Sequence, residues 1–367
     1  MKRLLVTVDS LRLDHYHLME HTSEFLGPSH GRAFSTATAT MGVFPTMMTG
    51  RYDINAYIDP LDSWIHEIGE PSIGITANRL TSVRYGYDDG FDYFTSPVSR
   101  GDESFKDRIA GKIPNGSVYR TASRLWSFWQ QHGSSGVGKS FRSTDEIVGE
   151  FLDWRRNRDD WFAWLHLMEP HHPYDPDNAE TSRAASQALS RDAIATNDPP
   201  DLEIVRDLYR QEVIETDSRL ERLWDAIPKD TQVVFAADHG ELLGENGIWG
   251  HPGQTFHPDI LRIPFATHNL TVGSGVVSFI DIPALFFDRD WRESRLERDV
   301  AFASMGGMKC AFDTAHMLTE NEYYALDDIN TGPSSRLRRA LESFTPSQVT
   351  KGDAIEADLE ALGYLDE

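Results

Sequence analysis

Residues 232–241 read Gln-Val-Val-Phe-Ala-Ala-Asp-His-Gly-Glu, an apolar run that ends in ionisable side chains. The apolar part is typical of a buried strand, and Asp238 and His239 follow directly at its carboxyl end. An adjacent carboxylate and imidazole can both bind a divalent cation. Farther along, in Trp249-Gly250-His251, a further imidazole could face a bound substrate. This segment therefore predicts half of a metal site.

A second acidic residue, Asp9, closes another apolar run at the start of the chain, Leu4-Leu5-Val6-Thr7-Val8. In open α/β sheets, ligands gather at the carboxyl ends of the parallel strands. We therefore expect Asp9, Asp238 and His239 to meet at one edge of a sheet.

Short apolar runs alternate with amphipathic segments, which is typical of a mostly parallel sheet flanked by helices. We expect strands at residues 3–8, 72–77, 161–166, 232–237 and 299–303. The clearest helix runs from about Leu202 to Ile227, where apolar residues recur with a helical period before Pro228 ends it. The stretch 178–200 is rich in Ala, Ser, Asp and Pro, and we interpret it as an excursion over the site.

After about Phe286 the alternation of strand-like and helix-like segments gives way to a different pattern. We expect an α/β catalytic domain over residues 1–290 and a small subdomain over residues 291–367 packed on it. This subdomain should consist of a short hairpin within 306–328 and a closing helix that Gly363 ends.

Four blocks of sequence stand in a familiar order and spacing, at residues 6–12, 40–50, 165–174 and 238–251. Through them the chain resembles, nearly from end to end, the sulfatase family of the alkaline phosphatase superfamily, in an archaeal-type form. The resemblance implies the central sheet of that superfamily, a bound metal ion and cleavage of a sulfate or phosphate ester.

The nucleophile departs from the family pattern. Sulfatases carry a Cys or Ser in a Cys/Ser-x-Pro-x-Arg motif that is oxidised to formylglycine, and counting back from Gly50 places Thr40 there. The following residues, 41–44, contain neither the Pro nor the Arg. Thr cannot become formylglycine, but a metal-bound hydroxyl can attack an ester directly. We expect Thr40 as nucleophile; the alternatives are Thr38, or a hydroxyl that only caps the next helix.

We expect the metal ligands to be Asp9, Thr40, Asp238 and His239. Two carboxylates, one imidazole and one hydroxyl suit one divalent ion of intermediate hardness. Mn²⁺ fits this set best, with Zn²⁺, Mg²⁺ and Ca²⁺ as alternatives. A second acidic ligand common in the family is replaced by Ser10.

His171 stands in Pro170-His171-His172-Pro173, which resembles the family segment that faces the sulfate or phosphate group. Met168 occupies the position at which sulfatases usually carry a Lys. We expect His171 and His251 to donate to the non-bridging oxygens or to protonate the departing alkoxide, since an imidazole titrates near neutrality.

Residues 133–140 match the P-loop pattern G-x-x-x-x-G-K-[ST]. A P-loop follows a buried strand and opens a helix at its Lys, whereas here the next helix is expected to begin near Ser143. We interpret the segment as a surface connector.

The chain carries 35 basic and 58 acidic residues, a net charge of −23, which argues against a nucleic-acid partner. Its basic residues are 28 Arg and only 7 Lys. An acidic, Lys-poor composition favours a protein adapted to high salt, where distant carboxylates are screened from an anionic substrate. The anionic substrate must then be attracted by groups close to it, which would be the metal, the two histidines, and Arg12 or Arg262.

Cys310 is the only cysteine, so no intrachain disulfide can form. The first expected strand begins next to Met1, and no apolar run approaches the ~20 residues of a spanning helix. We expect a cytoplasmic protein with no membrane span.

These observations predict a metal-dependent hydrolase that acts on a sulfated or phosphorylated sugar, lipid or small molecule. There are two alternatives. One is a phospho-group transferase, in which an alcohol takes the place of water, and the other is a binding protein that retains the fold but has no catalytic activity. The choice between sulfate and phosphate and the oligomeric state stay open.

Overall fold

The central sheet has six strands in the order β4-β3-β5-β1-β6-β9. The computed structural model describes residues 1–367 except 53–56, 99–139, 200, 254, 328–330 and 346–367. The strands of this sheet are β1 (Lys2–Val8), β3 (Ser72–Thr76), β4 (Tyr93–Thr95), β5 (Trp161–Leu167), β6 (Gln232–Ala237) and β9 (Phe265–His268). Neighbouring strands run parallel except β9, which is antiparallel to β6. The predicted mostly parallel sheet is confirmed.

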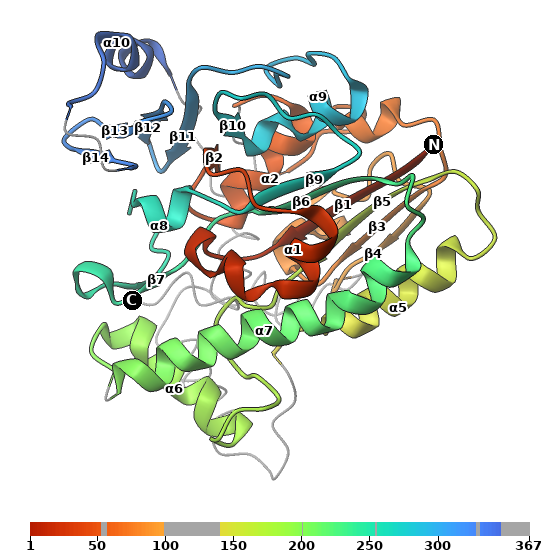
Figure 1. Cartoon of the computed structure of the whole chain (residues 1–367), viewed down its shortest axis with the longest axis horizontal. Coiled ribbons are helices and arrows are strands. Elements are labelled where there is room, and N and C mark those ends of the chain that lie inside the picture. The colour runs from red at the N-terminus through yellow and green to blue at the C-terminus, as the bar shows by residue number, and fades with distance from the viewer. Residues whose placement is uncertain (53–56, 99–139, 200, 254, 328–330, 346–367) are drawn as a thin grey trace, which may run out of the picture.

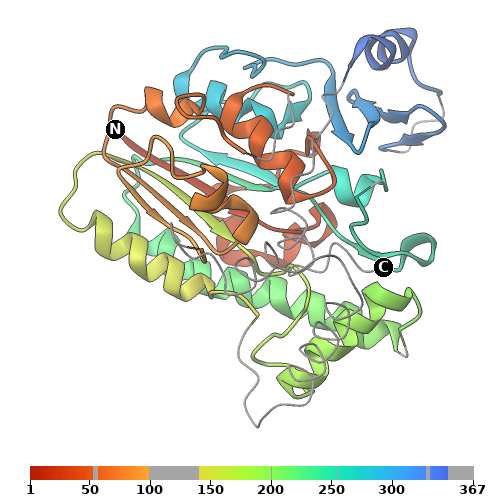
Figure 2. The same ribbon diagram turned by 180° about the vertical axis from the view of Figure 1, so that it is seen from behind.

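Helices cover both faces of this sheet (Figures 1 and 2). On one side lie α1 (Glu20–Leu26), α5 (Thr144–Arg155) and α7 (Leu202–Ala226), and on the other lie α2 (Thr40–Thr49) and α9 (Ile282–Phe287). Because the middle strands are covered twice, β1, β5 and β6 are apolar runs rather than alternating ones, and every side chain of β5 is buried.

Side-chain caps explain where the long helices begin. The carboxylate of Asp201 accepts hydrogen bonds from the backbone of Glu203 and Ile204, so α7 starts at Leu202 as predicted. Ser143 and Glu146 form a capping box at the start of α5, which confirms a helix beginning near Ser143. The P-loop-like residues 133–139 lie outside the described residues.

The stretch 178–200, interpreted as an excursion over the site, contains a helix that was not predicted, α6 (Arg183–Thr196). Ser182 caps it, and it packs against α7. Composition did not reveal the helix because its buried face consists of small or polar side chains, Ser186, Gln187, Ser190 and Ala193.

The C-terminal part forms a separate antiparallel sheet in the order β11-β12-β13-β14. Its strands are β11 (Ala301–Met305), β12 (Met308–Phe312), β13 (His316–Thr319) and β14 (Tyr323–Ala325), and α10 (Ser335–Ser343) packs on it through Leu337 and Leu341. The predicted hairpin is therefore part of a four-stranded sheet (Figure 1). The expected helix ending at Gly363 lies outside the described residues, and the boundary at 290 stays a prediction.

Shorter elements connect these parts. The pair β2 (Ala33–Phe34) and β10 (Val277–Ser278) is parallel, β7 (Leu242–Leu243) and β8 (Trp249–Gly250) form an antiparallel pair, and α8 (Pro258–Leu261) follows. Phe34 stacks on Phe312 with ring centroids 4.3 Å apart, which joins the small sheet to the main body. Among the helices in the described part of the chain, none combines the length and apolarity needed to cross a bilayer.

Candidate active site and metal centre

The candidate site lies at the carboxyl ends of the parallel strands β1, β3, β5 and β6. Strand β1 lies between β5 and β6, and Val8 is in register with Leu167 and Ala237. The backbone N–H of Asp9 donates to Leu167 O at 2.9 Å, and that of Asp238 donates to Val8 O at 3.2 Å. The residues that follow the three strands are therefore neighbours at one edge, as the strand-end rule predicts.

Thr40 is the first residue of α2, and its hydroxyl points at the strand ends. Its Oγ1 lies 2.9 Å from Asp238 Oδ2, 3.1 Å from Asp9 Oδ2 and 3.5 Å from His239 Nε2. All four side chains are fully buried. The structure thus brings together the four residues predicted as metal ligands, and we call them the acidic cluster.

The two alternatives for Thr40 do not fit this geometry. The residue at the N-cap of α2 is Ala39, and no side chain caps the helix, so Thr40 is not a capping hydroxyl. The hydroxyl of Thr38 donates to the backbone oxygen of Gly253 at 2.9 Å, away from the two carboxylates.

The acidic cluster has more acceptors than protons. One hydroxyl proton of Thr40 faces carboxylate oxygens of both Asp9 and Asp238. Burial and the charge of Asp9 raise the pKa of Asp238 to about 6. Burial opposes ionisation of Asp9 too, but His171, His166 and His239 hold its pKa well below the usual value. Two buried carboxylates this close together are stabilised by a bound cation. Ligand oxygens that lie near 3 Å from one another can each lie about 2.1–2.2 Å from one shared ion.

His239 presents the right atom to such an ion. Its Nδ1 lies 2.9 Å from Gly240 O, and since a carbonyl only accepts, Nδ1 carries the hydrogen and the lone pair is on Nε2. Nε2 lies 3.7 Å from Asp238 Oδ2 and 3.8 Å from Asp9 Oδ1. Burial lowers the pKa of His239, but the two carboxylates outweigh it and raise that pKa, so the site favours a positive charge at Nε2, either a proton or a metal ion.

Two supporting residues were not predicted from the sequence. Asn78 Nδ2 donates to Asp9 Oδ2 at 3.0 Å, and Ser10 Oγ donates to Asp9 Oδ1 at 3.0 Å. The backbone N–H of Ser10 donates to Asp238 Oδ1 at 3.2 Å, so the residue replacing the family's second acid orients both carboxylates. Asn78 could have been found, because it follows β3 at the same edge of the sheet.

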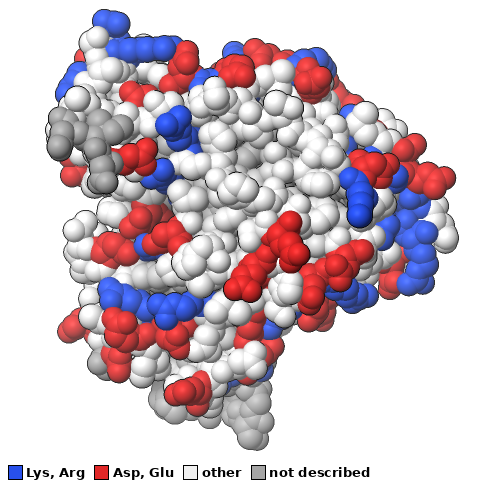
Figure 3. Space-filling view, in the orientation of Figure 1, with Lys and Arg blue, Asp and Glu red and all other residues white. Residues whose placement is uncertain are grey.

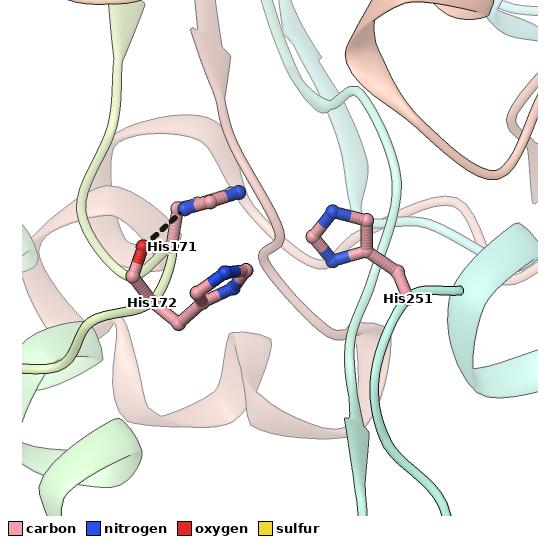
Figure 4. Close-up of side chains that lie close together, drawn as sticks. All are labelled: His171, His172 and His251. Atoms are coloured by element: carbon pink, nitrogen blue, oxygen red, sulfur yellow. Dashed lines mark hydrogen bonds between the residues drawn. The ribbon is translucent and has the colours of Figure 1, made fainter. Parts of the chain in front are cut away.

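Three histidines form a second group, the histidine cluster, made of His171, His172 and His251 (Figure 4). The first two follow β5 and the third follows β8. Ring centroids lie 4.2 Å apart for His171 and His172 and 5.2 Å apart for His171 and His251. The ring of His251 is 4.3 Å from that of His239, so the two clusters are adjacent.

The surroundings of His171 and His251 disfavour their protonated forms, most strongly for His171. Burial, and then the neighbouring His172, lower the pKa of His171 to about 3, so its imidazole is neutral at neutral pH. Burial likewise lowers the pKa of His251. Neither side chain titrates as an exposed imidazole does.

Glu241 is a further residue whose role the sequence did not reveal. Its Oε1 lies 2.8 Å from His251 Nδ1, and its Oε2 lies 3.7 Å from His172 Nδ1. Burial alone would raise the pKa of Glu241, but His251 and His172 lower it below its usual value. A buried carboxylate therefore sits behind the histidine cluster and orients His251.

The two arginines expected to attract the substrate are engaged elsewhere. Arg12 is buried and pairs with Asp14 at 2.7 Å and with Glu245 at 2.8 Å. Arg262 donates to Leu326 O at 2.7 Å and pairs with Asp327 at 3.3 Å, beside the small sheet. These contacts indicate structural roles for both side chains.

A cavity of about 440 Å³ opens beside the histidine cluster. Arg79, Phe141 and Arg142 are among its lining residues, and the ring of Phe141 packs edge-on against that of His171, 5.8 Å away. On the face drawn in Figure 3, the described Lys and Arg side chains lie among Asp and Glu rather than forming one broad basic surface.

Comparisons with known proteins agree with this architecture. The model of the sulfatase family matches residues 4–268. A relative from Haloferax volcanii, the low-salt glycan biosynthesis sulfotransferase Agl7, is 34% identical over 134 residues, which cover 32% of this chain and 30% of that protein. The match thus spans less than a third of the relative's length.

Several solved structures are similar in fold. The phosphonate monoester hydrolase SpPMH from Silicibacter pomeroyi has 15% identity and a TM-score of 0.56, over 89% of this chain and 87% of that one. The lipoteichoic acid synthase LtaP from Listeria monocytogenes has 15% identity and a TM-score of 0.57, over 99% and 92%. The periplasmic domain of EcEptC from Escherichia coli, in complex with Zn, has 11% identity and a TM-score of 0.56, over 90% and 94%. At these identities the likeness concerns the fold alone.

Proposed function

This chain belongs to the sulfatase family, and we propose that it is a metal-dependent hydrolase that cleaves a sulfate or phosphate ester through a covalent intermediate on Thr40. The position of the Thr40 hydroxyl carries the proposal. It lies at the start of a helix that it does not cap, within 3.1 Å of the nearest oxygens of Asp9 and Asp238.

The ligands of the ion are proposed to be Asp9, Thr40, Asp238 and His239. Bound there, a divalent cation would lower the pKa of the Thr40 hydroxyl and neutralise charge on the ester oxygens. The donor set suits Mn²⁺ best, with Zn²⁺, Mg²⁺ and Ca²⁺ as alternatives. Asn78 and Ser10 hold the Asp9 carboxylate in place, so the set is already oriented.

The chemistry assigned to the chain's residues has two steps. Thr40 Oγ1 attacks the phosphorus or sulfur, its proton passing towards a carboxylate of the acidic cluster, and the ester oxygen departs on the side of His171 and His251. Water then cleaves the ester on Thr40 and restores the hydroxyl. Burial lowers the pKa of both histidines. The proton donor is assigned to His251, because its Nδ1 is hydrogen-bonded to the Glu241 carboxylate, which counteracts that effect.

The proposed substrate is an anionic ester of a sugar, a lipid or a small molecule. The cavity beside His171 could receive the leaving group, and its lining includes Arg79, Arg142 and Glu150, of which the last two form an ion pair, so it suits a polar group. A protein of similar fold, Ps i-CgsB, has been solved in complex with k-i-k-neocarrahexaose, which supports a sugar as one of these substrate classes. A nucleic-acid substrate is not proposed, given the net charge of −23.

A group transferase is the second candidate. The relative Agl7 is named a sulfotransferase, which supports group transfer as an alternative to hydrolysis. An acceptor alcohol would then take the place of water in the second step. A protein that binds the ion and an ester without turnover is the third candidate.

A panel of esters tests these candidates together. Nitrophenyl sulfate, nitrophenyl phosphate, a phosphodiester and a phosphonate monoester are each assayed with Mn²⁺, Zn²⁺, Mg²⁺ or Ca²⁺ in molar KCl. We expect metal-dependent release of nitrophenol from at least one ester. Transfer to added glycerol that outcompetes water would favour the transferase, and a bound ion with every ester intact would favour the binding protein.

A further inference from the structure

We propose that a groove between the small C-terminal sheet and the segment from β7 to α8 binds a neutral sugar unit. Its volume of about 310 Å³ lies at the lower end of the roughly 300–1,000 Å³ of small-molecule sites. One wall comes from the main body and includes Ile248 and Phe256, and the other comes from the small sheet and includes Met308 and Tyr324. The two parts lie next to each other in Figures 1 and 2 and share one apolar core. The lining residues are distinct from both clusters of the candidate active site.

The floor of the groove is apolar and carries one partly exposed aromatic ring. Phe256 is buried in the core beneath the groove, whereas Tyr324 is only half-buried. The ring of Tyr324 packs edge-on against that of His257, with centroids 5.6 Å apart. Its hydroxyl donates to Glu322 Oε1 at 3.0 Å, which fixes the orientation of the ring. A flat ring held in this way offers an apolar face on which the C–H face of a sugar can stack.

The rim of the groove is polar and suits hydroxyl groups. His257 Nδ1 accepts from the backbone N–H of Asp259 at 3.2 Å, so Nε2 carries a hydrogen and is a donor. Asn246 and Asn321 are exposed, one on each wall, and each amide offers donors and an acceptor. Glu320 adds an exposed carboxylate that accepts. Sugar hydroxyls both donate and accept, so this mixture of neutral and acidic groups matches them.

The charge of the rim disfavours an anionic ligand. Glu320 and Glu322 contribute two carboxylates to the lining. Among the described lining residues Lys309 carries the single ammonium group, and its Nζ donates to Phe344 O at 2.7 Å. A sulfate or phosphate group in the groove would therefore meet negative charge. An acyl chain would leave the polar rim without hydrogen-bond partners, which is costly. A neutral sugar meets neither difficulty.

The segment after β8 connects the groove to the candidate active site. His251 belongs to the histidine cluster and Thr255 lines the groove, so their Cα atoms are at most about 14 Å apart. Between them, Gly253 O accepts from the hydroxyl of Thr38 at 2.9 Å, which fixes this segment beside the residues that lead to Thr40. A glycan whose ester lies at Thr40 would then place a neighbouring neutral unit near the groove. This role in substrate choice rests on the proposed hydrolysis, whereas binding of the sugar itself does not.

Binding of neutral sugars to the metal-free full chain tests the proposal. Maltotriose, mannotriose and cellotriose are titrated by calorimetry, and saturation-transfer NMR detects weak binding. We expect at least one of them to bind, and Tyr324→Ala to weaken its affinity by about tenfold or more, whereas Tyr324→Phe keeps the ring and should retain most of it. Tyr323→Ala is the matched control. Tyr323 is 52% exposed and, as the preceding residue of β14, points to the opposite face of the strand, so this variant should bind like the wild type.

A second variant decides if circular dichroism shows that Tyr324→Ala does not fold. Asn246→Gly combined with Asn321→Ala removes both exposed amides without changing the apolar floor, and should weaken sugar binding. Gly is chosen at the first position because Asn246 has a φ of 54°.

Three results would overturn the proposal: no binding of any of the trisaccharides, equal affinities in the Tyr323→Ala and Tyr324→Ala variants, or binding of adenosine, an aromatic probe, in preference to all three sugars. Failure of the proposed hydrolysis would be seen separately, as small nitrophenyl esters that stay intact with every metal. That failure would not change the sugar affinities.

Discussion

The hydroxyl oxygen of Thr40 lies 2.9 Å from Oδ2 of Asp238, although the two residues are 198 positions apart in the chain. The contact joins the first turn of α2 to the end of β6. It places a nucleophile candidate against a carboxylate whose pKa is raised to about 6 by burial and by Asp9. The proposed chemistry depends on this contact.

Replacing Thr40 tests the nucleophile. Thr40→Ala removes the oxygen that would form the covalent ester, so kcat should fall by about 10³-fold or more, while Thr40→Ser keeps the oxygen and should retain measurable turnover. Thr38→Ala is the matched control, because its hydroxyl bonds to Gly253 O instead of the acidic cluster. Equal losses in the Thr38 and Thr40 variants would indicate a packing effect rather than a lost nucleophile.

Thermal unfolding of the metal-free protein should depend on pH through Asp238. The folded-state pKa of this group is about 6, above its ordinary 3.8, so the folded state binds its proton more tightly than the unfolded state does. Its contribution is fully present below pH 4 and is lost as the pH rises to about 6. We therefore expect Tm to fall more steeply over this window in the wild type than in Asp238→Asn. Parallel Tm profiles would contradict the raised pKa.

Adding a divalent ion should restore the thermal stability that the metal-free protein loses as the pH rises. An ion bound only by the folded state stabilises it by mass action, so Tm at pH 7 should rise with Mn²⁺ or Zn²⁺ concentration. Asp9→Asn removes a ligand and should weaken the response, whereas Asp14→Asn, whose carboxylate pairs with Arg12 instead, should keep the response. An identical metal dependence in wild type and Asp9→Asn would place the ion elsewhere.

Glu241 should act by positioning its histidines. Glu241→Gln keeps the size of the side chain but removes the charge that holds His251 Nδ1–H at 2.8 Å. We expect kcat to drop about 10- to 100-fold with a shifted pH profile, because the orientation and basicity of His251 change. If kcat falls and the pH profile stays unchanged, the role of Glu241 is only structural.

High salt should favour activity. With a net charge of −23, the chain repels an anionic ester at low ionic strength, and about 1 M salt shortens the Debye length to roughly 3 Å. We expect kcat/KM to rise between 0.1 M and 2 M KCl. A steady fall over this range, with circular dichroism unchanged, would argue against adaptation to salt.

The sequence predicted those parts of the molecule that depend on local pattern. The continuous apolar runs of β1, β5 and β6 mark strands buried on both faces, and the period of α7 with Asp201 at its start marks a long helix. Because parallel strands end at one edge, the order of residues along the chain was enough to predict the convergence of Asp9 and Asp238.

Other features depend on tertiary contacts that no local pattern encodes. The contact of Glu241 with His172 and the support of Asp9 by Asn78 join segments far apart in the chain. The low pKa of His171 arises from burial beside His172, which composition does not report. The four-stranded C-terminal sheet was underestimated because its strands are only 3–5 residues long, too short for a clear alternation.

Anomalous diffraction from crystals loaded with Mn²⁺ addresses the central claim most directly. We predict one anomalous peak within about 2.0–2.4 Å of the side chains of Asp9, Thr40, Asp238 and His239. A peak bound by other residues, or an ion at the acidic cluster with the Thr40 hydroxyl turned away from it, would contradict the proposed metal-activated nucleophile.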